Sequence, residues 1–210
     1  MQTHYLQKYK LSLSLNQTQT AVLVGSLLGD GTLRVGKNAL NANFKVEQGL
    51  KQKDYVFWKY DVFKEWVLTP PKISKRYDEN RVPYEKSWWF RTVRHPKLTL
   101  FHNIFYKNRV KVVPKNIADL LDPLAISVWI MDDGNLSNNC INISTYSFKL
   151  GEIKLLQEVL LQKFALRSSF FKDRDKGFRM YFIRKETQKL IPLISSFIIP
   201  NLAYKIHVTP

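Results

Sequence analysis

Two aspartates in this 210-residue chain each follow an apolar stretch and precede a glycine. Asp30 ends the stretch 23–29, and Asp133 ends the stretch 126–132. Both stretches have apolar residues at helical spacing, so each aspartate is expected at the end of a helix, before a glycine that stops it. A carboxylate is unfavourable there because that end of the helix dipole is negative, and a bound cation would remove the penalty. If the helices pack side by side, divalent metal ions would relieve the repulsion between the two acids.

The first of these helices, expected over 17–30, carries small residues on one face. Gly25 and Gly29 lie four residues apart, and with Ser26 they leave a surface where another backbone can come close. The second helix is expected over 122–133, with an aspartate cap and a proline in its first turn. Its small residues near the expected contact are Ala125 and Ser127.

The charge balance favours a polyanionic partner. The chain has 33 lysines and arginines against 17 aspartates and glutamates, a net charge of +16, which is typical of proteins that bind nucleic acid or an anionic membrane. No run of about 18 apolar residues is present, so no membrane span is expected. The first ten residues lack the apolar core of a secretion signal. An intracellular location is expected, in the cytoplasm or inside an organelle such as a mitochondrion or chloroplast.

The metal expected beside the aspartates is one that oxygen ligands bind. Cys140 is the only cysteine, and the four histidines are scattered without the spacing of metal ligands. This composition excludes an internal disulfide and a cysteine-rich zinc site. Mg²⁺ is therefore expected, with Mn²⁺ able to substitute.

Hydrophobic periodicity predicts an α+β fold repeated in two halves. Each half reads helix, two strands, helix, two strands, helix; the first spans 16–113, the second spans 120–210, and 1–15 form a loosely placed arm. The first half is expected to contain strands at 32–36 and 41–48, a helix at 50–67, a hairpin at 72–77 and 87–94, and a helix at 96–108. After a linker at 109–119 and the second motif helix come strands at 135–138 and 140–146, a helix at 149–164, a hairpin at 167–183 and a helix at 185–198.

The stretches 23–31 and 126–134 resemble the paired motifs of LAGLIDADG homing endonucleases, in the form that carries both motifs on one chain. The likeness includes the segments 66–71 and 204–205 and covers nearly the whole chain. The second copy departs from the family pattern at three positions, Val128, Trp129 and Met131. The resemblance implies two αββαββα halves about a pseudo-twofold axis, with antiparallel sheets that form a saddle over duplex DNA.

The resemblance also assigns an active site. Its members are the metal ligands Asp30 and Asp133, the adjoining carbonyls of Gly29 and Asp132, with a secondary role for Asp132, and the basic residues Lys111 and Lys205. The implied reaction is Mg²⁺-dependent hydrolysis of both DNA strands, leaving 3′ overhangs, with the lysines offsetting developing negative charge. Because the two halves differ, the target is expected to be long and asymmetric. A chain with both motifs is expected to act as a monomer and to need no protein partner.

Polar side chains on the expected strands are candidates for contacts with phosphates and base edges. They are Asn43, Lys45, Arg76, Arg91, Asn142, Ser144, Lys172, Arg174 and Arg179. For any single one of them, a solvated surface residue is an equally good interpretation.

Three other functions remain open on the sequence alone. The chain could be an intron maturase, an RNA-binding splicing cofactor, as some members of the family are. It could also be a DNA-binding regulator of the same fold that does not cut, although both motif acids and both lysines are retained. A basic structural protein is the third, and the doubled Asp-Gly pattern argues against it. Splicing by purified protein would identify a maturase, and binding without cleavage would identify a regulator.

Overall fold

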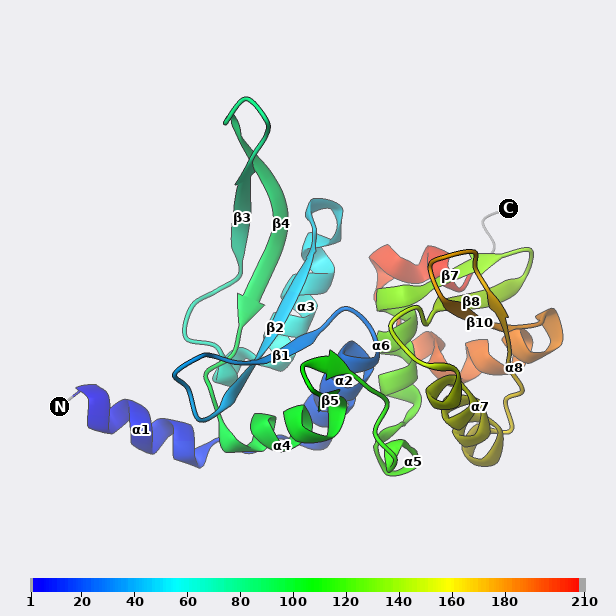
Figure 1. The fold of residues 1–210 in the computed structure, drawn as a ribbon, viewed down its shortest axis with the longest axis horizontal. Helices are drawn as coiled ribbons and strands as arrows, with labels where there is room; N and C mark the ends of the chain where they lie inside the picture. The colour runs from blue at the N-terminus through cyan, green and yellow to red at the C-terminus, as the bar shows by residue number, and fades with distance from the viewer. Residues whose placement is uncertain (1, 208–210) are drawn as a thin grey trace. The chain divides into compact units, whose positions relative to one another are not determined.

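The computed structural model describes residues 2–207, with side chains from residue 6 onward (Figure 1). The chain forms two compact units. The first unit comprises Met1–Thr20 and Asp30–His102, and the second comprises Ala21–Gly29 and Asn103–Pro210. The boundary runs through the first motif helix, so these compact units divide the chain differently from the two halves expected from the sequence.

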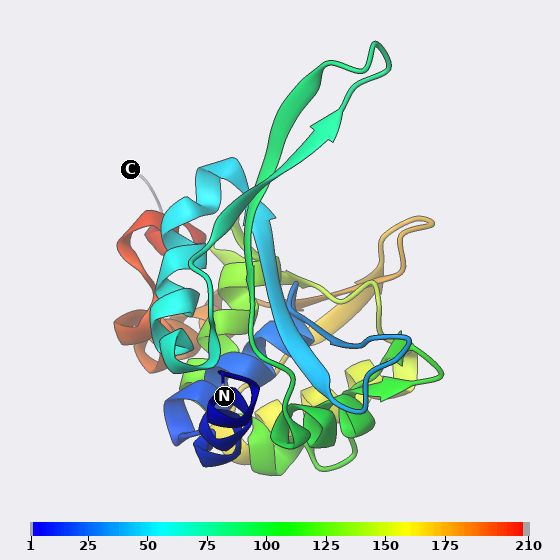
Figure 2. The ribbon, with the colours of Figure 1, turned by 90° about the vertical axis from the view of Figure 1, so that its left-hand side faces the viewer.

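The first unit is built on a four-stranded antiparallel sheet. Its strands are β1 (Thr32–Val35), β2 (Ala42–Gly49), β3 (Lys72–Tyr77) and β4 (Pro83–Arg91), in the order β1-β2-β4-β3. Its helices are α1 (Gln2–Ser12), the start of α2 (Gln17–Leu28), α3 (Lys53–Val62) and most of α4 (Pro96–Phe105). The β3–β4 hairpin reaches well beyond the ends of β1 and β2, as Figures 1 and 2 both show.

The second unit repeats this sheet. Its strands are β7 (Gly134–Ser137), β8 (Cys140–Ser144), β9 (Ser169–Lys172) and β10 (Phe178–Phe182), in the order β7-β8-β10-β9. The other elements are the short pair β5 (Tyr106–Lys107) and β6 (Val110–Lys111), and the helices α5 (Ile117–Leu120), α6 (Pro123–Asp133), α7 (Leu150–Phe164), α8 (Arg184–Ile194) and two 3₁₀ turns, Ser195–Phe197 and Pro200–Lys205. The matching strand order confirms the predicted α+β repeat of helix, two strands, helix, two strands, helix.

The caps expected for both motif helices are present. At the start of α2, Asn16 Oδ1 accepts a hydrogen bond from the Gln19 amide at 2.8 Å, and Gln19 Oε1 accepts one from the Asn16 amide at 3.1 Å. These reciprocal bonds satisfy amides that have no partner within the helix. At the start of α6, Asp122 Oδ1 accepts from the Ala125 amide at 2.7 Å, and Pro123 occupies the first turn.

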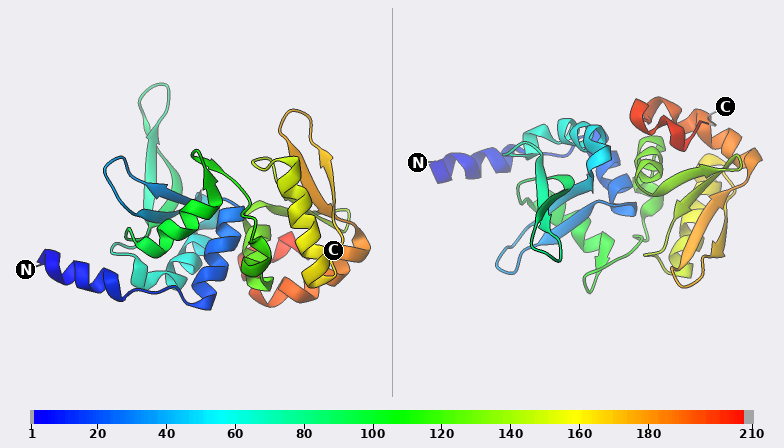
Figure 3. Two further views of the ribbon diagram at one scale, coloured as in Figure 1. Left: turned by 60° about the horizontal axis from the view of Figure 1, so that its bottom comes forward. Right: turned by 90° about the horizontal axis from the view of Figure 1, so that it is seen from above.

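Several of the predicted segments are wrong; the helix expected at 96–108, for example, ends at Phe105 and is followed by β5. The arm at 1–15 contains the helix α1 (Figure 3), and the linker at 109–119 contains β6 and α5. The helix expected at 50–67 is divided into a 3₁₀ turn (Leu50–Gln52), α3 and a second 3₁₀ turn (Lys64–Trp66). This last turn buries the Trp66 ring against His95, at 5.0 Å between ring centroids. Tertiary contacts of this kind override the local periodicity from which the longer helix was predicted.

One face of the first sheet is apolar and packs on α3. Three aromatic pairs join them: Phe44 with Phe63 at 5.2 Å, Phe57 with Trp88 at 5.5 Å, and Tyr60 with Phe90 at 5.9 Å between ring centroids. These contacts occupy the apolar face and leave the polar face of the same sheet uncovered by α3. Successive residues of a strand alternate between faces, so Asn43, Lys45 and Glu47 of β2 lie on that second face.

In the second unit, residues 21–28 of α2 pack closely on α6. A Cβ atom at Gly25 would collide with the carbonyl oxygen of Ala125 and lie 2.7 Å from Val128 Cβ. The expected close approach is therefore confirmed at Gly25 and Ala125. Ser127 is buried, and its hydroxyl bonds back to the Pro123 carbonyl at 2.6 Å. Val128, one of the departures from the family pattern, faces Gly25.

Candidate active site and sheet surface

A lysine of β6, Lys111, caps the C-terminal end of α2. The Gly29 amide bonds to the Gly25 carbonyl at 3.0 Å, and the Gly29 carbonyl accepts a hydrogen bond from Lys111 Nζ at 2.6 Å. Lys111 is half-buried and lies in the two-residue strand β6, paired with Tyr106. The last carbonyls of a helix have no partner within it and carry the negative end of its dipole. The Lys111 ammonium group gives the Gly29 carbonyl a hydrogen-bond donor, and its positive charge offsets the negative end of the helix dipole.

Lys205 caps the C-terminal end of α6 in the same way. Its Nζ donates to the carbonyls of Met131 at 2.5 Å and Asp132 at 3.1 Å. Lys205 is only 6% exposed and lies at the end of the last 3₁₀ turn. The two lysines singled out from the sequence therefore make equivalent contacts at the ends of the two motif helices.

The motif helix α6 ends at Asp133, as predicted, whereas α2 ends earlier than predicted. The helix α2 stops at Leu28 rather than residue 30. Gly134 follows α6 with an extended backbone, φ −84° and ψ 154°, so it is not a left-handed helix stop. Its small size is required for another reason, because a Cβ there would lie 2.6 Å from the Ile130 carbonyl oxygen.

Asp132 lies against the end of α2. A Cβ atom at Gly29 would fall 2.5 Å from Asp132 Cβ and 2.7 Å from its Oδ2. A larger residue at position 29 would therefore displace the Asp132 carboxylate. This contact gives Asp132 a definite position beside the residue that precedes Asp30 in the chain.

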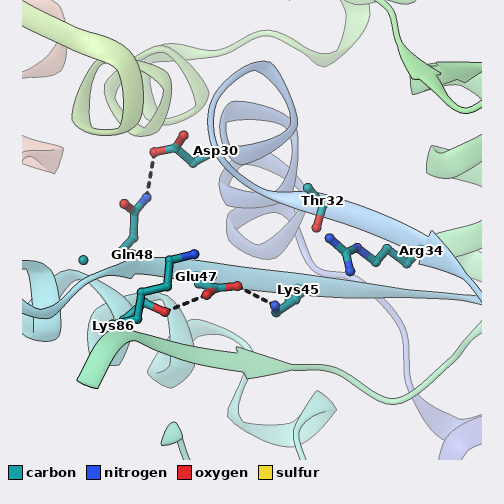
Figure 4. Close-up of a pocket in the computed structure, with 9 residues that line it drawn as sticks. Asp30, Thr32, Arg34, Lys45, Glu47, Gln48 and Lys86 are labelled. Carbon is teal, nitrogen blue, oxygen red and sulfur yellow. Dashed lines mark hydrogen bonds and ion pairs between the residues drawn. The ribbon is translucent and has the colours of Figure 1, made fainter. Parts of the chain in front are cut away.

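Asp30 is exposed, and its carboxylate accepts a hydrogen bond from Gln48 Nε2 at 3.0 Å (Figure 4). Gln48 belongs to β2 and is 8% exposed. The sequence analysis missed this residue, although a signal was present. Gln48 continues the buried phase of Ala42, Phe44 and Val46, and a polar side chain in such a phase needs a hydrogen-bonding partner.

An open pocket of about 380 Å³ surrounds this contact in the first unit. Its lining includes Asp30, Gln48, Glu47, Lys45 and Lys86. Glu47 accepts hydrogen bonds from Lys45 Nζ at 2.5 Å and from Ser87 Oγ at 2.6 Å (Figure 4). These bonds, the one from Lys45 first, lower the pKa of the Glu47 carboxyl below its usual value. The pocket therefore contains a second carboxylate that stays ionised.

Asp133 is half-buried as the last residue of α6. Within residues 2–207, no three side chains of histidine, cysteine, aspartate or glutamate gather into a cluster that could hold a metal ion. Both motif ends nevertheless present oxygen donors only, a carboxylate and adjoining main-chain carbonyls. A carbonyl oxygen has two lone pairs, so one that accepts a hydrogen bond from a lysine keeps a second lone pair for a metal ion. This donor chemistry fits Mg²⁺ or Mn²⁺.

Strand register places some of the predicted DNA contacts on one face of the first sheet. Lys45 pairs with Arg91, and Asn43 pairs with Arg34, so these side chains share the polar face. Asn43 is buried, with 8% exposed. The register shift between Ser74 and Lys75 leaves the extra residue, Lys86, in β4, so the side chains of β3 alternate without interruption and Arg76 shares the face of Lys72. Lys72 pairs with Trp89, which also pairs with Glu47, so this is the polar face that carries Lys45, and Arg76 is exposed there.

The second sheet gives a similar result. Asn142, Ser144 and Arg179 share its polar face, and Arg179 Nη2 donates to Asn135 Oδ1 at 2.5 Å. Lys172 pairs with Phe178 and so belongs to the opposite face, which corrects its predicted position. Arg174 lies in the exposed turn between β9 and β10, with φ 49°. The face on which Lys172 lies could not be assigned from the sequence, because the residue pattern did not show where β9 begins.

The comparisons with known proteins agree with the repeated fold. The model of the LAGLIDADG DNA endonuclease family matches residues 20–190. DNA endonuclease I-ChuI from Chlamydomonas applanata is 28% identical, with 92% of this chain and 96% of the relative covered. The cytochrome b mRNA maturase bI2 of Debaryomyces hansenii is 26% identical, with 91% and 74% covered.

Solved structures share the fold. The homing endonuclease I-WcaI, bound to its DNA recognition sequence, superposes with a TM-score of 0.89 at 23% identity, over 98% of this chain and 93% of that one. I-DmoI, in complex with DNA and Ca, has a TM-score of 0.53 at 13% identity, over 89% and 96%.

Two copies of one αββαββα unit, each opened by a helix that ends in Asp-Gly, define a single-chain protein with two motifs. With the family match over most of its length, the chain belongs to the LAGLIDADG DNA endonuclease family. No helix within residues 2–207 is long and apolar enough to cross a lipid bilayer.

Proposed function

We propose that this protein is a homing endonuclease that hydrolyses both strands of a long, asymmetric duplex DNA site, acts as a monomer and leaves 3′ overhangs. Membership of the family supports nuclease activity. The observation that carries the proposal is the repeated helix end. Each motif helix leads into an aspartate, and each has a lysine on its terminal carbonyls.

Asp30 and Asp133 are the proposed metal ligands, assisted by the carbonyls of Gly29 and Asp132. The oxygen-only donor set supports Mg²⁺, with Mn²⁺ as a substitute. The complex of I-DmoI with DNA and Ca supports a divalent cation in proteins of this fold. When bound, the metal would activate water and stabilise charge on the phosphate. Gln48 orients the Asp30 carboxylate through its amide.

Lys111 and Lys205 supply fixed positive charge at the carbonyls that end the two motif segments. Their hydrogen bonds to helix-end carbonyls hold each ammonium group in place before substrate arrives. A preorganised cation stabilises negative charge that develops on a phosphate without reorganising during the reaction. We therefore assign both lysines to charge stabilisation.

The first test is cleavage of a randomised duplex library by the purified protein, with Mg²⁺ and separately with Ca²⁺. Recovery of one long asymmetric site, cut on both strands only with Mg²⁺, supports the proposal. Enrichment of a bound site that is never cut would overturn it and indicate a DNA-binding regulator.

The second test substitutes the acids. Asp30→Asn and Asp133→Asn should each abolish double-strand cutting while duplex binding survives, because the amide retains shape but loses the charge that binds the metal. Asp61→Asn is the control, since Asp61 is an exposed residue of α3 adjacent to neither motif. Full activity of either motif variant would remove that residue from the metal ligands.

The third test concerns the lysines. Lys111→Ala should slow single-turnover cleavage at saturating protein more than it weakens binding. Lys107→Ala, which changes an exposed residue of the neighbouring strand β5, should alter neither strongly. An unchanged rate for Lys111→Ala would remove it from the catalytic residues.

A second candidate function is intron splicing. The relative named as a cytochrome b mRNA maturase covers 91% of this chain, which supports RNA binding as an additional activity. Unchanged splicing of a candidate host intron with purified protein would count against it. The expected location in the cytoplasm or an organelle stays a prediction.

A further inference from the structure

Two open pockets on the first unit share Arg91, Arg94 and Asn43. One, of about 310 Å³, is also lined by Lys10 of α1. The other, of about 300 Å³, is also lined by Arg34, Lys45 and Trp89. We call the cations of these two pockets the basic strip; it consists of Lys10, Arg34, Lys45, Arg91 and Arg94. No aspartate or glutamate lines either pocket.

The basic strip is not neutralised by the protein itself. Arg34, Arg91 and Arg94 are exposed, and none forms an ion pair within residues 2–207. Lys45 is the one member that is paired in this region, with Glu47. Like charges gathered on one surface repel, and a polyanion bound among them removes that cost. The strip therefore has the chemistry of a phosphate-binding surface.

The end of α1 is fixed beside this strip. The Tyr9 hydroxyl donates to the Glu65 carbonyl at 2.5 Å, and the His95 ring is hydrogen-bonded to the backbone of Lys10. Leu13, directly after the helix, is buried. These contacts give Lys10 a defined place, and His95 follows Arg94 directly in the chain.

The guanidinium group of Arg94 lies next to the turn between β1 and β2. A Cβ atom at Gly36, in the turn between β1 and β2, would lie 2.7 Å from Arg94 Nη2. The guanidinium group therefore lies over backbone that has no side chain. A planar guanidinium and a nearby ammonium suit a phosphate group, which accepts several charge-assisted hydrogen bonds.

We propose that α1 is part of the nucleic-acid surface, with Lys10 and Arg94 binding a backbone phosphate of duplex DNA that runs past the polar face of the first sheet. The inference rests on the proposed function for the choice of DNA, and it adds a contact that the strands alone do not provide. Because a phosphate carries no sequence information, this contact raises affinity for every duplex and does not select the target.

The test measures binding to a random-sequence duplex at several salt concentrations, so that it needs neither the target site nor cleavage. Lys10→Ala and Arg94→Ala should each weaken binding and reduce the slope of log affinity against log salt by about one. Lys8→Ala is the matched control, because Lys8 is an exposed residue of the same helix that lines neither pocket. Lys10→Arg should restore binding if charge at this position is what matters.

The outcomes separate the two proposals. If the wild type binds duplex but Lys10→Ala and Arg94→Ala match Lys8→Ala, the role of α1 is wrong and the nuclease proposal stands. If the wild type shows no salt-dependent binding to duplex DNA, the proposed function itself fails. If Lys10→Ala and Arg94→Ala lose binding to duplex RNA but keep binding to duplex DNA, the assignment of the phosphate to DNA is overturned. Unchanged circular dichroism and thermal midpoint must accompany a loss of binding for the phosphate contact to be accepted.

Discussion

The two sheets have the same strand order and equivalent register, but their polar faces carry different side chains. When Asp30 is aligned with Asp133, three paired positions of the first sheet correspond to three of the second. The first sheet has Thr32, Lys45 and Arg91 at these positions, and the second has Asn135, Asn142 and Tyr181. The first face is therefore rich in charge, whereas Arg179 is the one charged residue among the paired positions of the second polar face.

This difference shows how one framework can treat two half-sites unequally. We propose that phosphate contacts from the first face contribute affinity that depends on salt, and that the neutral amides and hydroxyls of the second face contact base edges. The asymmetry of the proposed DNA site follows from these side chains. The two sheets share their backbone arrangement and differ in the side chains of their polar faces.

The largest expected effect is on the shared framework. Gly25→Ala should destabilise the protein by at least about 1–3 kcal/mol, because the added methyl group collides with α6 and the helices must separate. Urea unfolding measures the change. Gly151→Ala is the control: a Cβ at Gly151 has no atom within 4 Å, so this variant should be neutral or slightly stabilising. Equal stability of the two variants would show that the close helix contact is not important.

The next effect tests the unlike faces. Arg91→Tyr gives the first face the residue of the second, and it should lower the salt slope of duplex binding by about one. Tyr181→Arg makes the reverse change and should raise the slope by a similar amount. Titrations at several salt concentrations provide the measurement. Slopes that do not move in opposite directions would mean that the faces do not bind DNA in the proposed way.

A smaller effect is expected at the acids. Gln48 donates to Asp30, whereas Thr145, at the equivalent register, donates its hydroxyl to the Phe178 carbonyl at 2.8 Å. Gln48→Ala should therefore slow cleavage of one strand about tenfold and cause nicked plasmid to accumulate, because the Asp30 carboxylate loses an orienting hydrogen bond. Thr145→Ser, which keeps the hydroxyl, should preserve the ratio of nicked to linear product. Equal slowing of both strands by Gln48→Ala would contradict this.

The smallest effect concerns pH and the first unit. Burial lowers the pKa of His95 below its usual value, an effect that the hydrogen bond to Lys10 partly opposes. The unfolded chain therefore takes up a proton at higher pH than the folded protein does. The stabilisation from neutral His95 is present above the unfolded pKa, near 6.5, and is lost as pH falls through the lower folded pKa. Protonation would also break the bond from the Lys97 amide to His95 Nδ1, at 3.1 Å.

Thermal midpoints between neutral and mildly acidic pH measure this effect. His95→Gln should flatten the dependence on pH, whereas His102→Gln, in α4, should leave it in place. A pH dependence that survives His95→Gln would assign it to another group.

Much of the fold could be predicted because its signals are local. The Asn16–Gln19 cap, the Asp-Pro start of α6 and the alternating strands depend on residues that are neighbours in the chain. The division of the 50–67 helix could not be predicted, since it depends on Trp66 reaching His95, far away in sequence. The helix α1 was missed because the segment is polar and basic, and the alternation of Leu11, Leu13 and Leu15 lies at and beyond the end of the helix.

The sequence by itself determined the repeat, the two acids and the excess of positive charge, because each of these is a matter of residue type and spacing, whereas the two lysines came from the resemblance to the LAGLIDADG family. Only the tertiary structure decided that Gln48 bonds to Asp30, that Lys172 lies on the opposite face of its sheet, and that Lys10 and Arg94 line the same pocket. The physical reason is register: a shift of one residue in a strand moves a side chain to the other face, and no local pattern records which pairing the sheet adopts.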